Sequence, residues 1–392
     1  MLGGGAAHST AMGAVQMVNR FGRGEWAGAF GDLGTLIPFV VAYVGLLHMD
    51  PFGILLAFGL AKIASGLLYR TPFPIQPMKA IGAAATTQAT QNFIVTPGAV
   101  YGAGLTTGVL WLVLGLTGLA DRIARITPRA VVTGIVLGLG LKFMGDGVGM
   151  MAAGWWLAVP SLLLALVLLN NQRIPAMFVL LLIGAVAAAI EHPTLGTMLA
   201  HTHPRLHLPQ WHLGDMTLTE FVGGSVLLAL PQLPLTLGNA LIAITEENNR
   251  LFPDRPVTER RVAISTGLMN LASPLLGGVP MCHGAGGMAG HVRFGARTGG
   301  ALVILGVLLT VLALFFSDSV VEILRLFPAS VLGVILFLAG TQLALGACDF
   351  GPDKGARFVA VVTTALSLWN VGAAFVAGIA VSLLLRRQWI RL

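Results

Sequence analysis

Charged side chains are scarce in this chain of 392 residues. Asp, Glu, Lys and Arg make up 10% of the sequence and hydrophobic residues 56%, whereas soluble domains carry about 25% charged and about 45–50% apolar residues. So few charges do not cover the surface of a soluble protein of this length, which excludes two or three soluble domains. The 51 glycines suit helices that pack closely in lipid. The sequence therefore predicts an all-α polytopic membrane protein.

Other classes of protein are excluded by what is missing. The two cysteines, Cys282 and Cys348, fall in different apolar segments, so we expect no disulfide framework. The N-terminal segment 1–25 contains no continuous apolar run, which argues against a cleaved signal peptide. The net charge of +7 arises in short connections between apolar runs, a pattern typical of membrane topology signals and not of nucleic-acid binding. No GxSxG or HExxH motif and no paired catalytic carboxylates support an enzyme.

Apolar runs of about the length that crosses a bilayer recur along the chain. We expect fourteen spans, seven in residues 26–190 and seven in 220–386, with an external loop at 191–219 and cytoplasmic segments at 1–25 and 387–392. With the N-terminus inside, Arg205 and Arg325 are the only loop arginines that fall outside, so both termini are predicted to be cytoplasmic. The short loops favour the cell membrane of a bacterium, that is its inner membrane, as the location of the protein. A eukaryotic organelle is the alternative.

The two halves of the chain repeat each other at a nearly constant offset. Pro128 in RITPRAVVTG matches Pro328 in RLFPASVLGV, and Asp32 in FGDLGTLIPF matches Gln232 in LPQLPLTLGN. With seven spans in each half, the second half enters the membrane from the opposite face. The predicted fold is an inverted-topology repeat, which is typical of secondary transporters.

Segments interrupted by glycine and proline lie at matching positions, PFPIQPMKAIGAAA at 72–85 and GGVPMCHGAGGMAG at 277–290. Because proline disfavours helix before it, we expect each segment to be an extended piece followed by a helix that begins near mid-membrane. These are the predicted broken spans 3 and 10. Their helix N-termini would meet at the centre and present N–H groups and positive dipole ends to an anion. The alternative is two ordinary helices that are merely kinked.

Four stretches resemble the molybdate transporter family, a plant and prokaryotic branch of the sulfate permease superfamily. They are FGDLGTLIPF, PIQPMKAIGAAA, LPLTLGNALIAI and the block from GLMNLASP to VRFGARTGGA. The resemblance covers about residues 26–386. It implies seven plus seven inverted spans, divided into a core domain (spans 1–4 and 8–11) and a gate domain (spans 5–7 and 12–14), and uptake of molybdate. Because the chain ends just after the last span, we expect it to lack the cytoplasmic regulatory domain of most sulfate permeases.

Lys79 is predicted to lie near the bilayer centre, where a lysine costs about 2.5–3.5 kcal/mol on insertion scales and needs a partner. We expect its ammonium group to face the bound dianion, with a structural ion pair to Asp32 as the alternative. Asp32 would repel an oxyanion when ionised and tolerate it when protonated, which makes it the candidate for proton coupling. A helix N-terminal cap is the alternative for Asp32.

Uncharged hydrogen-bonding side chains lie on the same segments, and oxyanion sites can be built from such donors and backbone amides. The candidate substrate-binding residues are Thr35, Gln76, Met78, Lys79, Gln232, Thr236, Asn239, Cys282 and His283. Interhelical hydrogen bonding is the alternative for the polar members of this set. Arg293 and Arg297 are interpreted as topology and packing charges, with attraction of the anion towards the cytoplasmic exit as the alternative.

We expect no cofactor and no metal site. His201 and His203 in the external loop have no acidic or cysteine partner at metal-site spacing, so a solvated loop is the preferred interpretation. The predicted function is secondary active transport of molybdate by alternating access, coupled to protons as a symport. Sulfate or general oxyanion transport, and less readily an oxyanion channel, are the alternatives. The expected partners are the oxyanion, protons and membrane lipid, with no nucleic acid, and a homodimer is left open.

Overall fold

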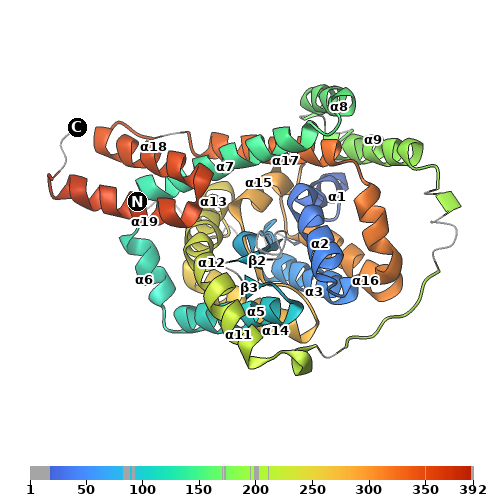
Figure 1. The fold of residues 1–392 in the computed structure, drawn as a ribbon. Coiled ribbons are helices and arrows are strands. Elements are labelled where there is room, and N and C mark those ends of the chain that lie inside the picture. The colour runs from blue at the N-terminus through green and yellow to red at the C-terminus, as the bar shows by residue number, and fades with distance from the viewer. Residues whose placement is uncertain are drawn as a thin grey trace, which may run out of the picture.

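The computed structural model describes residues 18–82, 89–90, 93–169, 171, 174–194, 196–197, 203–210, 212–348 and 350–389. Helices dominate these residues, which confirms the all-α prediction (Figure 1). The strands in the described part of the chain form two short antiparallel ladders: β1 (Gln76–Pro77) pairs with β4 (Met281–Cys282), and β2 (Ala89–Thr90) pairs with β3 (Phe93–Ile94).

Helices occupy most of the described residues of the first half. In the first half they are α1 (Arg23–Ala29), α2 (Leu33–Leu47), α3 (Pro51–Tyr69), α5 (Pro97–Leu116), α6 (Leu119–Ile126), α7 (Arg129–Met151), α8 (Trp155–Leu168) and α9 (Ala176–Glu191). Proline at the first position of α3 and α5, preceded by the capping side chains of Asp50 and Thr96, fixes where these two helices begin.

The second half is less regular near its start. Its elements are η1 (Leu213–Asp215), α11 (Leu218–Gly223), η2 (Gly224–Ala229), α12 (Leu230–Leu235), η3 (Thr236–Ala243), α13 (Ile244–Leu251), α14 (Glu259–Leu275), α15 (Ala285–Arg293), α16 (Gly300–Leu326), α17 (Ala329–Gly346), α18 (Lys354–Trp369) and α19 (Val371–Arg386). Two wide π-helical stretches, η2 and η3, lie at the start of the second predicted repeat. Helix α16 has a kink at Phe316, whose backbone is not helical, and continues to Leu326.

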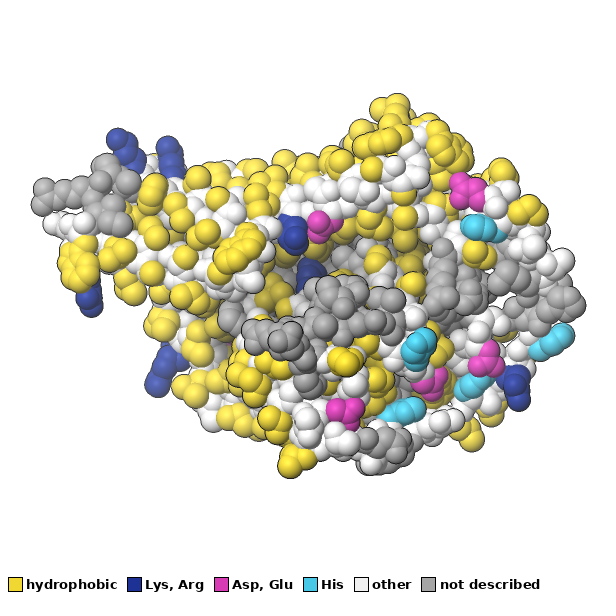
Figure 2. All heavy atoms as spheres, viewed as in Figure 1, with side chains coloured by type: hydrophobic (Ala, Val, Ile, Leu, Met, Phe, Trp, Pro, Cys, Tyr) yellow, Lys and Arg dark blue, Asp and Glu magenta, His cyan; other side chains and the backbone are white. Residues whose placement is uncertain are grey.

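Several helices are suited to a bilayer. In the described residues, five are long and apolar enough to cross a membrane: α3, α5, α7, α17 and the Gly300–Ser319 part of α16. The number rises to seven if the bent pairs α1–α2 and α11–α13 each count as one span, and α8, α9 and α19 are shorter apolar helices. Hydrophobic side chains cover much of the outer surface above α7, α17 and α18 (Figure 2). The chain is a multi-pass membrane protein, and the fourteen crossings stay a prediction.

Helices from the two halves approach each other closely at glycine. A Cβ atom on Gly59 of α3 would lie 2.9 Å from the carbonyl oxygen of Gly306 of α16. A Cβ atom on Gly140 of α7 would lie 2.9 Å from the carbonyl oxygen of Gly340 of α17, and one on Gly340 would lie 2.7 Å from that of Gly140. Only residues without a side chain allow backbones to meet at this distance, as is common between membrane helices.

The pairing of helices is reciprocal between the halves. α3 packs along α16 and α5 packs along α14, while α7 and α17 pack along each other. The offset that the sequence repeat predicts relates α3 to α14, α5 to α16 and α7 to α17. The repeat therefore maps the α3–α16 pair onto the α14–α5 pair, and it maps the α7–α17 pair onto itself. This reciprocity agrees with the internal repeat that the sequence predicts.

The helices form two layers. α7, α17, α18 and α19 run side by side, with α8 and α9 at one end, and make up the upper layer in Figure 1. α1, α2, α3, α5 and α11 to α16 make up the lower layer. α15 packs against both α7 and α17, so it lies where the two layers meet. The upper layer contains α7, α8 and α9 together with α17, α18 and α19, which lie in the last three predicted spans of each half (spans 5–7 and 12–14).

Candidate functional site

Two extended pieces meet side by side in the interior. In the β1–β4 ladder Gln76 is opposite Cys282 and Pro77 is opposite Met281, and the N–H of Met78 donates to the carbonyl oxygen of Pro280 at 2.9 Å. A helix follows each piece, over residues 79–82 in the first half and as α15 in the second. The prediction of extended pieces that lead into helices is confirmed, and the alternative of two kinked helices is wrong.

Glycine allows β1 to lie directly against the N-terminus of α15. Gly284 precedes the helix, and a Cβ atom there would overlap the side-chain oxygen of Gln76. A Cβ atom on Gly287 would lie 2.8 Å from Cβ of Pro74. A larger residue at either position would push the two elements apart. The N-terminus of α15, with its unsatisfied N–H groups, therefore faces the Gln76 side chain.

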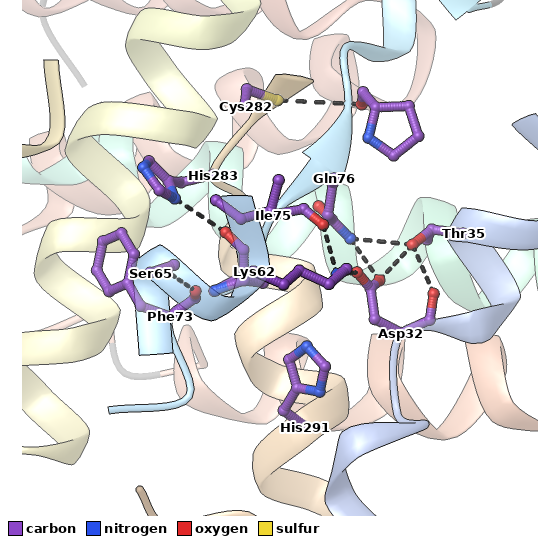
Figure 3. Close-up of polar contacts among 12 residues, drawn as sticks. Asp32, Thr35, Lys62, Ser65, Phe73, Ile75, Gln76, Cys282, His283 and His291 are labelled. Carbon is purple, nitrogen blue, oxygen red and sulfur yellow. Dashed lines mark hydrogen bonds and ion pairs between the residues drawn. The ribbon is translucent and has the colours of Figure 1, made fainter. Parts of the chain in front are cut away.

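Asp32 is the centre of a buried polar network (Figure 3). Its Oδ1 accepts a hydrogen bond from Nε2 of Gln76 at 2.6 Å and another from the hydroxyl of Thr35. The same Gln76 nitrogen lies 3.0 Å from Oγ1 of Thr35. Nζ of Lys62, on α3, lies 3.9 Å from the other carboxylate oxygen and donates to the carbonyl oxygen of Ile75 at 2.7 Å. The network thus joins α2 and α3 to β1.

Two alternatives considered for these residues are wrong. Asp32 stands at the N-cap position of α2, but its side chain makes no capping hydrogen bond there. Its ion-pair partner is Lys62 and not Lys79. Lys62 is the site residue that the sequence reasoning missed, although a lysine inside an apolar span was itself a signal. The geometry explains the choice, because the network holds Asp32 beside α3, whereas Nζ of Lys79 lies 4.1 Å from the centre of the Phe143 ring on α7.

Residues of the second half complete the surroundings of the first broken segment. Oε1 of Gln232, on α12, accepts a hydrogen bond from the backbone N–H of Ala80 at 2.8 Å, and its Nε2 donates to Oγ1 of Thr236 at 3.0 Å. Gln232 therefore satisfies one N–H at the start of the helix that follows β1. Asn239, on η3, is buried, and its Nδ2 would lie 3.5 Å from a Cβ atom on Gly284.

His283, Cys282 and Met78 serve the packing of the broken segments. Nδ1 of His283 lies 2.9 Å from the carbonyl oxygen of Pro74, and Nε2 lies 2.8 Å from Oγ of Ser265. Both ring nitrogens are thus used within the protein, which favours the structural alternative for this residue. Sγ of Cys282 lies 4.0 Å from the carbonyl oxygen of Pro77, and Met78 is fully buried. Their contact with substrate stays a prediction.

Three buried polar atoms near the N-terminus of α15 have no hydrogen-bond partner among the described residues. They are Oε1 of Gln76, Oδ1 of Asn239 and Nζ of Lys79. The first two side chains adjoin Gly284, and Lys79 adjoins the Phe143 ring, which a Cβ atom on Gly286 would overlap. Buried polar groups are normally paired. Three unpaired ones from both halves, around one helix N-terminus, indicate a place for a polar ligand.

The charge of this centre is positive. Lys62 and Asp32 compensate each other, which leaves the ammonium group of Lys79 and the positive dipole ends of two helices. Among the described residues no group of three or more His, Cys, Asp or Glu side chains is placed to hold a metal ion. His203 belongs to the described residues, and His201 lies outside them. The arrangement therefore suits an anion.

A model of one known family matches the chain over two stretches. The family is described as molybdate transporter of MFS superfamily, and the matched residues are 24–143 and 224–343. The two stretches are equal in length, and the shift from one to the other is the offset of the internal repeat.

Curated relatives extend over most of the chain. Molybdate transporter 2 of Arabidopsis thaliana is 32% identical, with 92% of this chain and 87% of that protein covered. Molybdate transporter 1 of the same plant is 32% identical, with 93% and 88% covered. Molybdate transporter 1 of Chlamydomonas reinhardtii is 28% identical, with 91% and 90% covered.

Solved structures share the fold at low sequence identity. The murine Slc26a9 anion transporter in its inward-facing state matches with a TM-score of 0.64 and 12% identity, over 96% of this chain and 70% of that one. The transmembrane domain of the cyanobacterial bicarbonate transporter BicA matches with a TM-score of 0.56 and 14% identity, over 91% and 96%. At this identity the likeness shows the fold alone.

Proposed function

Because this chain belongs to the molybdate transporter family, we propose that it carries molybdate across a membrane as a secondary active transporter. The relatives that support this are named transporters, and the chain is a transport protein and not an enzyme. The observation that carries the proposal is the ammonium group of Lys79, which is buried without a hydrogen-bond partner among the described residues, near the N-terminus of α15, where the amide side chains of Gln76 and Asn239 also lie.

The charge at this place suits a tetrahedral dianion. Each helix N-terminus carries roughly half a positive charge, and Lys79 supplies one more. While Asp32 is ionised and compensates Lys62, the sum of about two positive charges offsets the two negative charges of molybdate. When Asp32 is protonated, the charge of Lys62 adds to this attraction. The backbone N–H groups at the start of α15 and Nδ2 of Asn239, which lies beside Gly284, supply hydrogen bonds, and Thr35, Gln232 and Thr236 hold the side chains and backbone around them.

Gln76 supports a link between the anion and a proton. While Asp32 is ionised, it and Thr35 hold the Gln76 amino group, and the Gln76 oxygen is left facing the site, where it repels an anion. A protonated Asp32 donates its O–H to the Gln76 oxygen once the amide has turned over. The N–H groups of Gln76 then face the anion, so uptake of a proton favours uptake of molybdate.

The groups that face Asp32 decide when it takes up this proton. Lys62 on α3 lies 3.9 Å away and favours the ionised carboxylate. An arriving dianion adds two negative charges to this set. It therefore opposes Lys62 and Lys79 and makes protonation of Asp32 more favourable.

Alternating access is the proposed way in which the site opens to each side. The lower layer would be the core domain that holds the anion, and the upper layer would be the gate against which it moves. The two inverted seven-span repeats, 26–190 and 220–386, would be joined by an external loop at 191–219. The positive charge of the remaining loops supports cytoplasmic termini at 1–25 and 387–392 in the cell membrane of a bacterium.

The proposal is tested by binding of molybdate to the purified protein, with sulfate as competitor. We expect tight binding that excess sulfate does not displace, at least tenfold weaker in Lys79→Ala and unchanged in Lys354→Ala, which removes an exposed lysine at the start of α18. Equal competition by sulfate would indicate a general oxyanion transporter, and currents without counterflow in liposomes would indicate a channel. Absence of binding for both anions would refute the proposed function.

A further inference from the structure

A cavity lies at the C-terminal end of α15, away from the central site. It has a volume of about 560 Å³, and its lining includes Arg293, Arg297, Asn171, Gln342 and the first residues of α9. α15 contains nine residues, and at 1.5 Å per residue it separates this cavity from the central site by about 13 Å. α15 belongs to the lower layer, and α9 and α17 belong to the upper layer, so the cavity lies between the two layers.

The lining of this cavity is cationic. It contains two guanidinium groups and no carboxylate among its described residues. The nearby acid Glu25 is engaged elsewhere: its Oε1 accepts from the backbone N–H groups of Arg297 at 3.0 Å and Thr298 at 2.9 Å, and its Oε2 accepts from that of Ala301 at 3.2 Å. Glu25 therefore caps the start of α16 and forms no ion pair with either arginine of the cavity.

The two arginines have different surroundings. The guanidinium group of Arg297 donates to the carbonyl oxygens of Val292 and Ala296 at 2.9 and 2.8 Å, so Arg297 satisfies the C-terminal end of α15. Arg293 makes no hydrogen bond or ion pair with any residue that the structure describes, although its Nε atom is buried. A buried N–H without a partner is destabilising, and a guanidinium group is well shaped to hold an oxyanion through two parallel hydrogen bonds.

The start of α9 adds a further attraction for an anion. Pro175 and Ala176 line the cavity, and no side chain caps this 16-residue helix. Its first N–H groups and positive dipole end therefore face the same space as Arg293. Gln342 of α17 contributes an amide from the upper layer. Cations and neutral donors thus converge from both layers.

We propose that this cavity is a second site for a tetrahedral oxyanion, held by Arg293 together with Gln342 and the N-terminus of α9. Molybdate, free phosphate and the phosphate of a lipid headgroup share the required chemistry. Such an ion connects α15 to α9 and α17, and so it ties the lower layer to the upper one. On the premise of the proposed function, the two layers move against each other during transport. An oxyanion in the cavity opposes this motion, so transport slows when oxyanion accumulates on the side of the membrane to which the cavity opens.

The test counts the molybdate ions that the purified full-length protein binds at equilibrium. We expect two ions per chain for the unmodified protein and for Arg122→Gln, which removes an exposed arginine of α6. One ion is expected for Arg293→Gln, which loses the cavity site, and one for Lys79→Ala at molybdate concentrations that leave its weakened central site unoccupied. Arg293→Lys keeps the charge without the paired hydrogen bonds and should bind the second ion at least tenfold more weakly.

The outcomes separate this inference from the proposed function. A single ion that Lys79→Ala abolishes and Arg293→Gln leaves in place would overturn the second site and support the central one. A single ion that only Arg293→Gln abolishes would support the cavity and refute the proposed function. Gln342→Glu places a carboxylate in the cavity and leaves Arg293 intact, so it should remove the second ion even where Arg293→Gln does not fold. An unchanged count of two in Gln342→Glu would contradict the inference.

The source of the oxyanion is decided by competition. Binding is repeated with added phosphatidylglycerol, with phosphatidylcholine as the neutral-headgroup control, and with inorganic phosphate. Displacement of the second molybdate by phosphatidylglycerol alone supports a lipid phosphate as occupant. Displacement by inorganic phosphate supports a free ion. If neither displaces it and Arg293→Gln also leaves it bound, the cavity is not an oxyanion site.

Discussion

Lys62→Met is the substitution that tests the buried network most directly. The side chains of Lys62 and Asp32 are 0% and 1% exposed. Methionine fills a similar volume, but it leaves the carboxylate of Asp32 without a cation and the carbonyl oxygen of Ile75 without its donor. Removing one partner of a buried ion pair destabilises a protein by about 3–5 kcal/mol, and a buried unsatisfied carbonyl adds about 1–3 kcal/mol. We therefore expect the free energy of unfolding to fall by at least about 3 kcal/mol.

The second substitution, Asp32→Asn, separates the ion pair from general damage to packing. Asparagine still accepts a hydrogen bond from Gln76 or Thr35, and it leaves no uncompensated charge beside the methionine that replaces Lys62. The double variant should therefore be more stable than the sum of the two single effects predicts, by about 1–3 kcal/mol. Lys354→Met, which replaces an exposed lysine, should change stability by less than about 0.5 kcal/mol.

The assay is reversible unfolding in mixed micelles, followed by tryptophan fluorescence at neutral pH. The four proteins of the cycle are compared at one detergent composition, so that the reference state is the same for each. Effects of Lys62→Met and Asp32→Asn that add within about 0.5 kcal/mol would show that the two side chains do not interact. That result would refute the network as the anchor of β1.

Three further predictions concern the site. Gly284→Ala places a Cβ atom against the oxygen of Gln76 and should weaken molybdate binding at least tenfold in equilibrium titrations; an unchanged affinity would remove the Gln76 amide from the site. In the unmodified protein, molybdate binding should strengthen as pH falls, because protonated Asp32 releases the Gln76 amino group. The Asp32→Asn variant should bind molybdate equally at each pH and lose proton-driven uptake in liposomes. Full proton-driven accumulation by this variant would refute the coupling mechanism. Ser265→Ala removes the partner of Nε2 of His283 and should lower stability by about 1 kcal/mol without changing molybdate affinity; a large loss of affinity would assign His283 to the anion.

The broken segments could be predicted because their cause is local. Pro72, Pro74 and Pro77 remove backbone donors and disfavour helical conformation in the residues before them. These prolines therefore predict an extended piece without any knowledge of the tertiary structure. Repetition of the pattern near Pro280 then predicted two such pieces facing each other. The positions of Gln232 and Asn239 near the centre followed from the same repeat and agree with the structure.

Contacts that depend on helix rotation could not be predicted. Lys62 lies within α3 and Asp32 precedes α2, and which lysine reaches the carboxylate is decided by how α2 packs on α3 and β1. The sequence therefore offered Lys79 as an equally good partner. The wide turns η2 and η3 were also missed, because π-helical turns arise from tertiary packing and lack a residue pattern of their own.

Biosynthesis must bring together two strands that are made far apart in time. Gln76 and its partner Cys282 belong to opposite halves of the chain, and at about 5–20 residues per second the ribosome needs about 10–40 s to cover the interval between them. Throughout this delay the strand in the first half has no partner, and unpaired backbone groups are destabilising by several kcal/mol each in lipid. The nascent first half therefore has to keep this segment near water or under a chaperone. A chain that stops before residue 282 leaves it exposed for good and becomes a target for membrane quality control.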